Sequence, residues 1–156
     1  MFMKRKHTLI LLVLFLSLLF TVDSALAAMV AIKGDDINMR SGPGTKYKVL
    51  WKLDSGFPLK ILKKKGSWYR VQDFEGTIGW VHRNVTTRKG HMIVDVNKKS
   101  QKRVNVRSGP GTNNRIVAKA YYGVVFRTLK QKSGWVQVEH EKGVRGWIKR
   151  SLVWGF

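Results

Sequence analysis

Short stretches of this chain alternate between apolar and polar residues, as antiparallel β-strands do. In residues 135–139, Val136 and Val138 share one parity, while the tryptophan, glutamine and glutamate around them share the other. Successive side chains of a strand point to opposite faces of its sheet. We therefore expect the two valines to face a core and Trp135 to lie on the polar face.

The same alternation occurs in two further segments. Residues 68–72 direct Tyr69 and Val71 inward and place Trp68 with the polar residues. Residues 145–149 direct Ile148 inward and place Trp147 beside the charged residues. These patterns put the tryptophans on the polar side of each predicted strand.

The rest of the pattern also indicates short strands separated by glycine-containing turns, with no sustained helical periodicity after the first 27 residues. Four more strands are predicted, at Val49–Leu53, Phe57–Leu62, Ile116–Ala120 and Val124–Leu129. Strands at this spacing favour an all-β fold built from small barrels.

One sequence motif occurs twice. Residues 38–45 read N-M-R-S-G-P-G-T, and residues 105–112, 67 positions later, read N-V-R-S-G-P-G-T. Trp68 and Trp135 have the same offset, so the chain holds a tandem duplication. In each motif, Gly-Pro-Gly predicts a type II turn with a positive φ at its last glycine, Gly44 or Gly111. We place the two domains at residues 28–88 and 89–156.

The first 27 residues have the composition of a secretory signal. Lys4, Arg5 and Lys6 precede an apolar run of about 12 residues, and Ala25-Leu26-Ala27 offers small residues at a cleavage site. The run is shorter than the roughly 20 residues of a membrane-spanning helix. We expect cleavage after Ala27; an uncleaved amino-terminal anchor is the alternative.

Charge narrows the classes of partner. The formal net charge is +21, and +19 after removal of residues 1–27, which carry three basic residues and one acid. Such a charge attracts polyanions. Export favours envelope polymers, anionic lipid headgroups at a membrane surface and acidic proteins, and disfavours nucleic acid. The sequence has no cysteine, so neither disulfides nor a lipid-modified cysteine is available.

Aromatic residues on the polar faces are the candidate ligand-binding groups, because an indole ring offers a large apolar surface with a polar edge. We select Trp68, Trp135, Trp80 and Trp147, and we add Tyr69, which follows Trp68 although its parity is inward. The alternative is a structural role, covering the barrel or the contact between repeats. That alternative is stronger for Trp80 and Trp147 than for Trp68 and Trp135.

Other polar positions fit structural roles better. An arginine beside a tight turn usually donates to nearby carbonyls, which we expect of Arg40 and Arg107. Asn38 and Asn105 are expected to form turns through their side chains. The basic runs Lys63–Lys65 and Lys98–Arg103 predict solvated hairpin tips or loops that contribute to attraction in aggregate.

The sequence offers little for catalysis. It has no cysteine nucleophile, and no histidine stands in a metal-ligand spacing with an acid. The glycine-rich motif lacks the spacing and the lysine of a phosphate-binding loop. We therefore expect no enzyme activity, no metal and no cofactor; a hydrolase without a recognisable motif is the third and weakest hypothesis.

Four motifs in order, each present twice, resemble the bacterial SH3-like domain. They are the N-x-R-S-G-P-G-T opening, a glycine–apolar strand pair, the Trp-x-x-Val strand and a closing Gly-Trp-Val or Gly-Trp-Ile, within residues 37–85 and 104–152. The resemblance implies a barrel of five or six strands per repeat and a non-catalytic role in the bacterial envelope. Members of the family often target catalytic domains to peptidoglycan or bind peptides.

The leading hypothesis is an exported binding protein, periplasmic or associated with the cell wall, that attaches to peptidoglycan or an anionic wall polymer. The alternative is an adaptor whose tandem barrels bind an envelope protein or peptide. Neither the ligand nor the oligomeric state follows from the sequence.

The predicted secretory signal, residues 1–27, gives a first testable prediction. Mass spectrometry of the exported protein should find an amino terminus at Ala28 or within two residues of it, because the small residues a signal peptidase reads end at Ala27. Recovery of a chain that retains Met1 in a membrane pellet would show an anchored protein instead.

Overall fold

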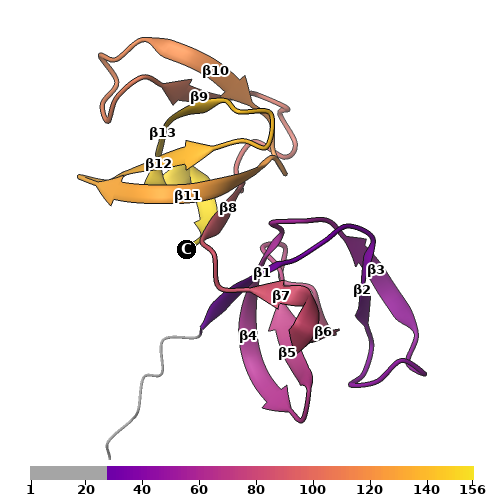
Figure 1. The fold of residues 1–156 in the computed structure, drawn as a ribbon. Helices are drawn as coiled ribbons and strands as arrows, with labels where there is room; N and C mark the ends of the chain where they lie inside the picture. The colour runs from indigo at the N-terminus through magenta and orange to yellow at the C-terminus, as the bar shows by residue number, and fades with distance from the viewer. Residues whose placement is uncertain (1–27) are drawn as a thin grey trace, which may run out of the picture.

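The computed structural model describes residues 28–156, which form two β-sheets (Figure 1). Each sheet has seven strands and its paired strands are antiparallel, so the prediction of an all-β chain is confirmed. The resemblance implied five or six strands; a short closing strand at the end of each repeat raises the number. The predicted signal, residues 1–27, lies outside the described residues. Within the described part, no helix has the length and apolar content to cross a bilayer.

The two halves of the chain follow the same element order. The first repeat consists of β1 (Met29–Ile32), β2 (Ile37–Arg40), β3 (Val49–Leu53), β4 (Pro58–Lys65), β5 (Trp68–Gln72), β6 (Ile78–His82), the 3₁₀ turn η2 (Arg83–Val85) and β7 (Thr86–Thr87). The second repeat consists of β8 (His91–Val94), β9 (Val104–Arg107), β10 (Ile116–Ala120), β11 (Val125–Lys132), β12 (Trp135–Glu139), β13 (Arg145–Lys149), η3 (Arg150–Leu152) and β14 (Val153–Gly155), followed by Phe156.

The sheets also share one topology. The strand order is β3-β2-β6-β5-β4-β1-β7 in the first repeat and β10-β9-β13-β12-β11-β8-β14 in the second. Each repeat therefore curls the same antiparallel sheet around its own core, with β3 and β10 at corresponding edges.

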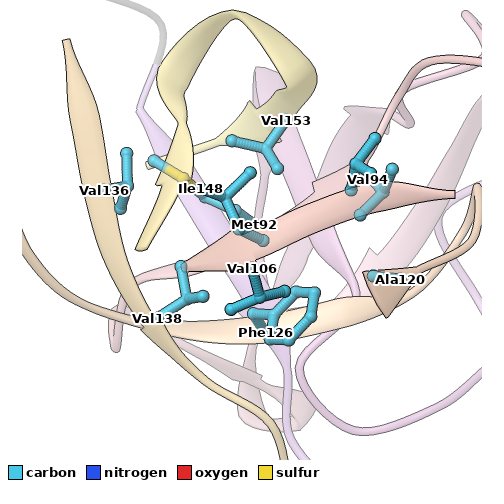
Figure 2. Close-up of a cluster of buried hydrophobic side chains, with 10 residues drawn as sticks. Met92, Val94, Val106, Ala120, Phe126, Val136, Val138, Ile148 and Val153 are labelled. Carbon is cyan, nitrogen blue, oxygen red and sulfur yellow. The ribbon is translucent and has the colours of Figure 1, made fainter. Parts of the chain in front are cut away.

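Each repeat buries its own apolar cluster, and the alternation in the sequence identifies the residues. Val136, Val138 and Ile148 are fully buried, as predicted, and Figure 2 shows them pointing into one cluster. The other buried members of that cluster are Met92, Val94, Val104, Val106, Ala120, Phe126 and Val153. The first repeat buries Val30, Ile32, Met39, Leu53, Leu59, Val71 and Val81.

The predicted strands are present, and two of them are longer than predicted. β4 runs to Lys65 and β11 to Lys132, three residues beyond the predicted ends. Their last residues are lysines and a glutamine, which show no apolar alternation. They remain in the strand because they pair with the next one: Lys65 lies opposite Trp68, and Lys132 opposite Trp135.

The predicted type II turn at Gly42-Pro43-Gly44 is wrong. The φ of Gly44 lies outside the left-handed range that a type II turn needs. The Gly44 amide donates to the Gly42 carbonyl at 3.0 Å, and the Tyr47 amide donates to the Gly44 carbonyl at 3.3 Å. Gly42 serves to leave space, because a Cβ there would lie 2.4 Å from the Tyr47 ring. In the second repeat Gly111 has a φ of 147°, and a Cβ on Gly109 would lie 2.5 Å from Asn114.

The residues after η3 have a positional counterpart that their composition does not reveal. β14 pairs with β8 just as β7 pairs with β1, so Val153 stands where Thr86 stands in the first repeat. Val153 is buried in the second core. Phe156 lines a cavity together with Ala28 and Met29 of the first repeat, so the last residues of the chain pack at the seam between the repeats.

The two repeats meet through an aromatic contact. Only residues 88–90 separate β7 from β8. The Phe74 ring lies 5.8 Å from Phe57 in its own repeat and 5.3 Å from Tyr122 of the second. The junction also needs Gly56, since a Cβ there would lie 2.8 Å from the His91 ring.

A carboxylate completes the junction. Glu75 accepts hydrogen bonds from the Tyr122 hydroxyl and the Lys98 ammonium of the second repeat. These two donors lower the pKa of Glu75, while burial and the nearby Glu75 carboxylate raise the pKa of the Tyr122 hydroxyl. Lys98 belongs to the β8–β9 loop, residues 95–103, which is longer than the matching loop of the first repeat, residues 33–36. The second repeat thus uses an enlarged loop to hold the first.

The turn geometry predicts unequal effects of two neighbouring substitutions. Gly42→Ala should destabilise the protein by about 1–3 kcal/mol, because the new methyl group must displace the Tyr47 ring. Gly44→Ala is the matched control: its Cβ would meet the same ring at 3.4 Å, an ordinary contact, and should cost less than about 1 kcal/mol. Denaturant unfolding measures both. Equal losses would contradict this account of the motif.

Candidate functional site

Tryptophans and basic residues share the outer face of the first sheet. The strand register places Arg40, Trp80, Arg70 and Lys63 side by side across β2, β6, β5 and β4. The neighbouring row runs from Lys65 through Trp68 to His82. Directly opposed residues of antiparallel strands have Cβ atoms about 4.5–5.5 Å apart, so each indole has cationic or imidazole neighbours.

The second sheet repeats this arrangement. Its first row contains Arg107, Trp147, Gln137 and Lys130, and its second contains Lys132, Trp135 and Lys149. We call these two sets of residues the tryptophan faces. The two faces differ where Arg70 is replaced by Gln137 and His82 by Lys149.

Four of the five predicted ligand-binding residues lie on these faces, two on each. Trp68, Trp80 and Trp135 are half-buried. Trp68 stands edge-on to His82, with ring centroids 5.3 Å apart and an interplanar angle of 80°. An exposed flank on each of these three indoles leaves ring surface for a ligand.

Trp147 does not share this exposure. It lies on the outer side, as the alternation predicted, yet only 6% of its surface is accessible. The Lys130 ammonium lies 5.6 Å from its ring centroid, so the lysine side chain covers the ring. The prediction of Trp147 as a ligand platform therefore fails, since little of its ring is free.

Tyr69 is separated from the tryptophans. It lies on the inner side of β5, packs against the first core and lines the cavity of about 600 Å³ at the seam. That cavity also contains Arg83, Arg88 and Phe156, and no acid lines it. Tyr69 is thus not part of a tryptophan face.

Arg40 and Arg107, the arginines of the repeated motif, stabilise the loops that follow them. Arg40 Nη1 donates to the carbonyls of Thr45 and Tyr47, each at 2.9 Å, and Arg107 Nη1 donates to Asn114 at 2.8 Å. The expectation of a structural role is confirmed for both. The prediction for Asn38 and Asn105 is wrong, because both lie inside strands, β2 and β9, where the backbone is extended.

The basic runs are exposed as predicted. Lys63, Lys64 and Lys65 end β4 beside the β4–β5 turn, while Lys98, Lys99, Lys102 and Arg103 lie in the β8–β9 loop. One acid borders the second tryptophan face: Glu139 accepts hydrogen bonds from Arg127 and Arg145, which lower its pKa. Because the two arginines offset the negative charge of Glu139, this carboxylate repels an anionic ligand of the second tryptophan face less.

A second cavity between the repeats is acidic and was missed at the sequence level. It measures about 930 Å³ and is lined by Asp35, Asp54, Glu139 and Glu141, with His91 and His140. Its carboxylates come from both repeats, so no local spacing could have revealed it. Within residues 28–156, no three acids or histidines approach closely enough to hold a metal ion.

Residues 33–87 and 100–155 match the family described as the bacterial SH3 domain. The chain belongs to this family. The match covers both repeats and confirms the resemblance seen in the sequence, together with the fold of two tandem SH3-like domains.

The chain is also similar in sequence to curated proteins. The chain is 28% identical over 159 residues to a putative N-acetylmuramoyl-L-alanine amidase, YrvJ, of Bacillus subtilis, a match covering 96% of this chain and 30% of the relative. It is 38% identical over 48 residues to a probable cell wall amidase, LytH, of Staphylococcus epidermidis, covering 30% of this chain and 16% of the relative. The chain thus spans less than a third of the curated relatives that it matches.

Among solved structures, the chain is similar to an NlpC/P60 family protein from Bacillus cereus, at 13% identity, a TM-score of 0.34 and coverage of 81% of this chain and 56% of that one. NlpC2 from Trichomonas vaginalis gives 10% identity and a TM-score of 0.35, with coverage of 81% and 47%. Scores of this size carry no argument about function.

The exposure of the tryptophans predicts an order of stabilities. Trp147→Ala should cost about 3–5 kcal/mol, as expected for a buried large aromatic. Trp68→Ala and Trp135→Ala, at half-buried outer positions, should each cost distinctly less. Thermal or denaturant unfolding of the three variants tests this order. A loss for Trp68→Ala or Trp135→Ala as large as that for Trp147→Ala would show that these rings are structural as well.

Proposed function

We propose that this protein is an exported, non-catalytic binding protein of the bacterial envelope that attaches to peptidoglycan or an anionic wall polymer. The observation that carries the proposal is the repeated outer face, in which tryptophans alternate with basic side chains across neighbouring strands. The predicted signal cleavage after Ala27 would deliver it to the periplasm or the wall.

The chemistry of the faces suits a charged saccharide polymer. The flat, apolar faces of sugar rings stack against aromatic side chains, and the carboxylates or phosphates of the polymer can pair with arginine and lysine. The partly exposed rings belong to Trp68, Trp80 and Trp135, each beside a cation or His82 in the register. The family and the amidase relatives, whose names refer to the cell wall or to a wall bond, support this ligand class.

Two faces in one chain favour a polymer over a small ligand. When both repeats bind the same polymer, the second contact forms at high effective concentration and strengthens the first. The junction built by Phe74, Glu75 and Tyr122 limits the motion of one face relative to the other. Preorganisation of this kind lowers the entropic cost of the second contact.

A non-catalytic role fits the groups that are present. Three of the four carboxylates of the acidic cavity accept hydrogen bonds: Asp35 from the Ser55 amide, Asp54 from the Asp36 amide, and Glu139 from two arginines. The amidase activity in the relatives' names is not carried over, because the match covers 30% or less of their length. The rival function is that of an adaptor for an envelope protein or peptide.

Binding to purified cell-wall sacculi tests the proposal. Trp68→Ala and Trp135→Ala should each weaken binding by about 2 kcal/mol, roughly 30-fold in Kd, if the rings anchor the polymer. Trp51→Ala is the matched control, since it removes an exposed tryptophan that lies outside both faces. Co-sedimentation measures all three.

Salt tests the contribution of charge. Binding should weaken steeply between about 0.01 M and 0.15 M salt, over which the screening length falls from ~30 Å to ~8 Å. A protein that is retained by envelope proteins but not by sacculi would favour the adaptor. Binding unaffected by both tryptophan substitutions would exclude the faces as the attachment site.

A further inference from the structure

Exposed apolar side chains gather at one edge of the first repeat. Of the nine large apolar residues that are exposed in residues 28–156, four lie within five positions: Tyr47, Val49, Leu50 and Trp51. Trp51 is the most exposed of the nine, at 57%. Exposed apolar residues on most protein surfaces are scattered singly. We call these four residues the apolar patch.

The patch lies along an unpaired strand edge. β3 ends the strand order of its sheet and is paired with β2 alone, and Figure 1 shows it at the outside of the first repeat. Along its other side, no strand within residues 28–156 takes up the backbone N–H and C=O groups. Such an edge can accept an extended peptide as an additional strand.

The duplication shows that the fold does not require this patch. In the second repeat Asn114 takes the place of Tyr47, and Ala118 takes the place of Trp51. Ala118 is half-buried against the second core, and β10 forms with the same bounds relative to β9. A barrel of this type therefore closes with alanine at the position of Trp51.

Charge selects the kind of partner. Lys46, Lys48 and Lys52 are exposed and interleave with the apolar residues of the edge. Lys52 pairs with Asp36 at 3.2 Å, and the side chains of both are largely exposed. A second copy would set lysine against lysine in a protein of net charge +21, which disfavours self-pairing. An acidic strand would meet complementary charge.

We propose that the outer edge of β3 binds an extended acidic segment of a partner protein, which adds to the sheet as a strand. An apolar side chain of the segment lies against Trp51, and its carboxylates pair with lysines of the edge. This site is separate from the tryptophan faces, so it stands or falls independently of wall-polymer binding.

Selection from a displayed library of eight-residue peptides on the exported protein tests the proposal. Selected peptides should be rich in Asp and Glu alternating with apolar residues. A synthetic peptide from the selection should bind Trp51→Ala at least tenfold more weakly than the unaltered protein. Tyr121→Ala is the control, because it removes another aromatic residue that is 52% exposed but lies off β3. A melting temperature near that of the unaltered protein shows that Trp51→Ala is folded.

Two further measurements identify the mode of binding. Replacing alternate peptide residues by their N-methyl forms should abolish binding, because strand addition needs the peptide N–H groups. Equal binding of the methylated peptide, or of Trp51→Ala, would overturn the proposal. So would a selection without acidic enrichment, a dimer in sedimentation that Trp51→Ala converts to monomer, or loss of sacculus binding in Trp51→Ala. The last two outcomes would assign the edge to a second copy or to the wall polymer.

Discussion

The register of the antiparallel strands is the constraint on which the rest of this structure depends. Each sheet buries one face, and the period of two along a strand means that a slip by one residue would exchange core and surface. Val71 and Val81 in the first repeat, and Val136 and Ile148 in the second, are fully buried and fix that register. Once these residues are buried, the tryptophans of the same strands have the opposite parity and must project outward. There they align in rows with arginine and lysine.

The two copies use this framework differently. Trp80 is half-buried beside Arg70, whereas Trp147 is covered by Lys130 and has Gln137 in place of the arginine. The β3 edge shows a contrast in the same direction, because Trp51 is exposed and Ala118 is partly buried against the core. Duplication thus preserved the barrel while the two outer surfaces diverged.

The few acids of the described chain mostly have structural partners, which leaves the outer faces basic. Asp73 accepts from the Glu75 and Thr77 amides and closes a turn. Glu75 holds the junction, and Glu139 binds Arg127 and Arg145. Four acids gather at the inter-repeat cavity, and one of them, Glu139, also borders the second tryptophan face, where it is paired with two arginines. This separation of charge lets a strongly basic protein fold compactly and still present cations to a polyanion.

The sequence alone predicted seven of the fourteen strands within residues 28–156, the duplication, and the side of each predicted strand on which its residues lie. Local alternation suffices for this, because a side chain's face depends only on its position along an extended backbone. It also predicted the carbonyl contacts of Arg40 and Arg107, whose partners lie within seven residues. The motif spacing was enough to recognise the family.

Only the tertiary structure decided how much of each outer residue is exposed, because exposure depends on side chains from neighbouring strands. Lys130 on β11 covers Trp147, and the edge position of β3 uncovers Trp51; neither follows from the residues next to them in sequence. The first motif turn was misread for a similar reason, since Gly44 lacks the predicted positive φ and Gly42 is constrained by the ring of Tyr47. The junction of Phe74, Glu75 and Tyr122 joins residues up to 48 positions apart in the chain, and packing brought them together where no local pattern could.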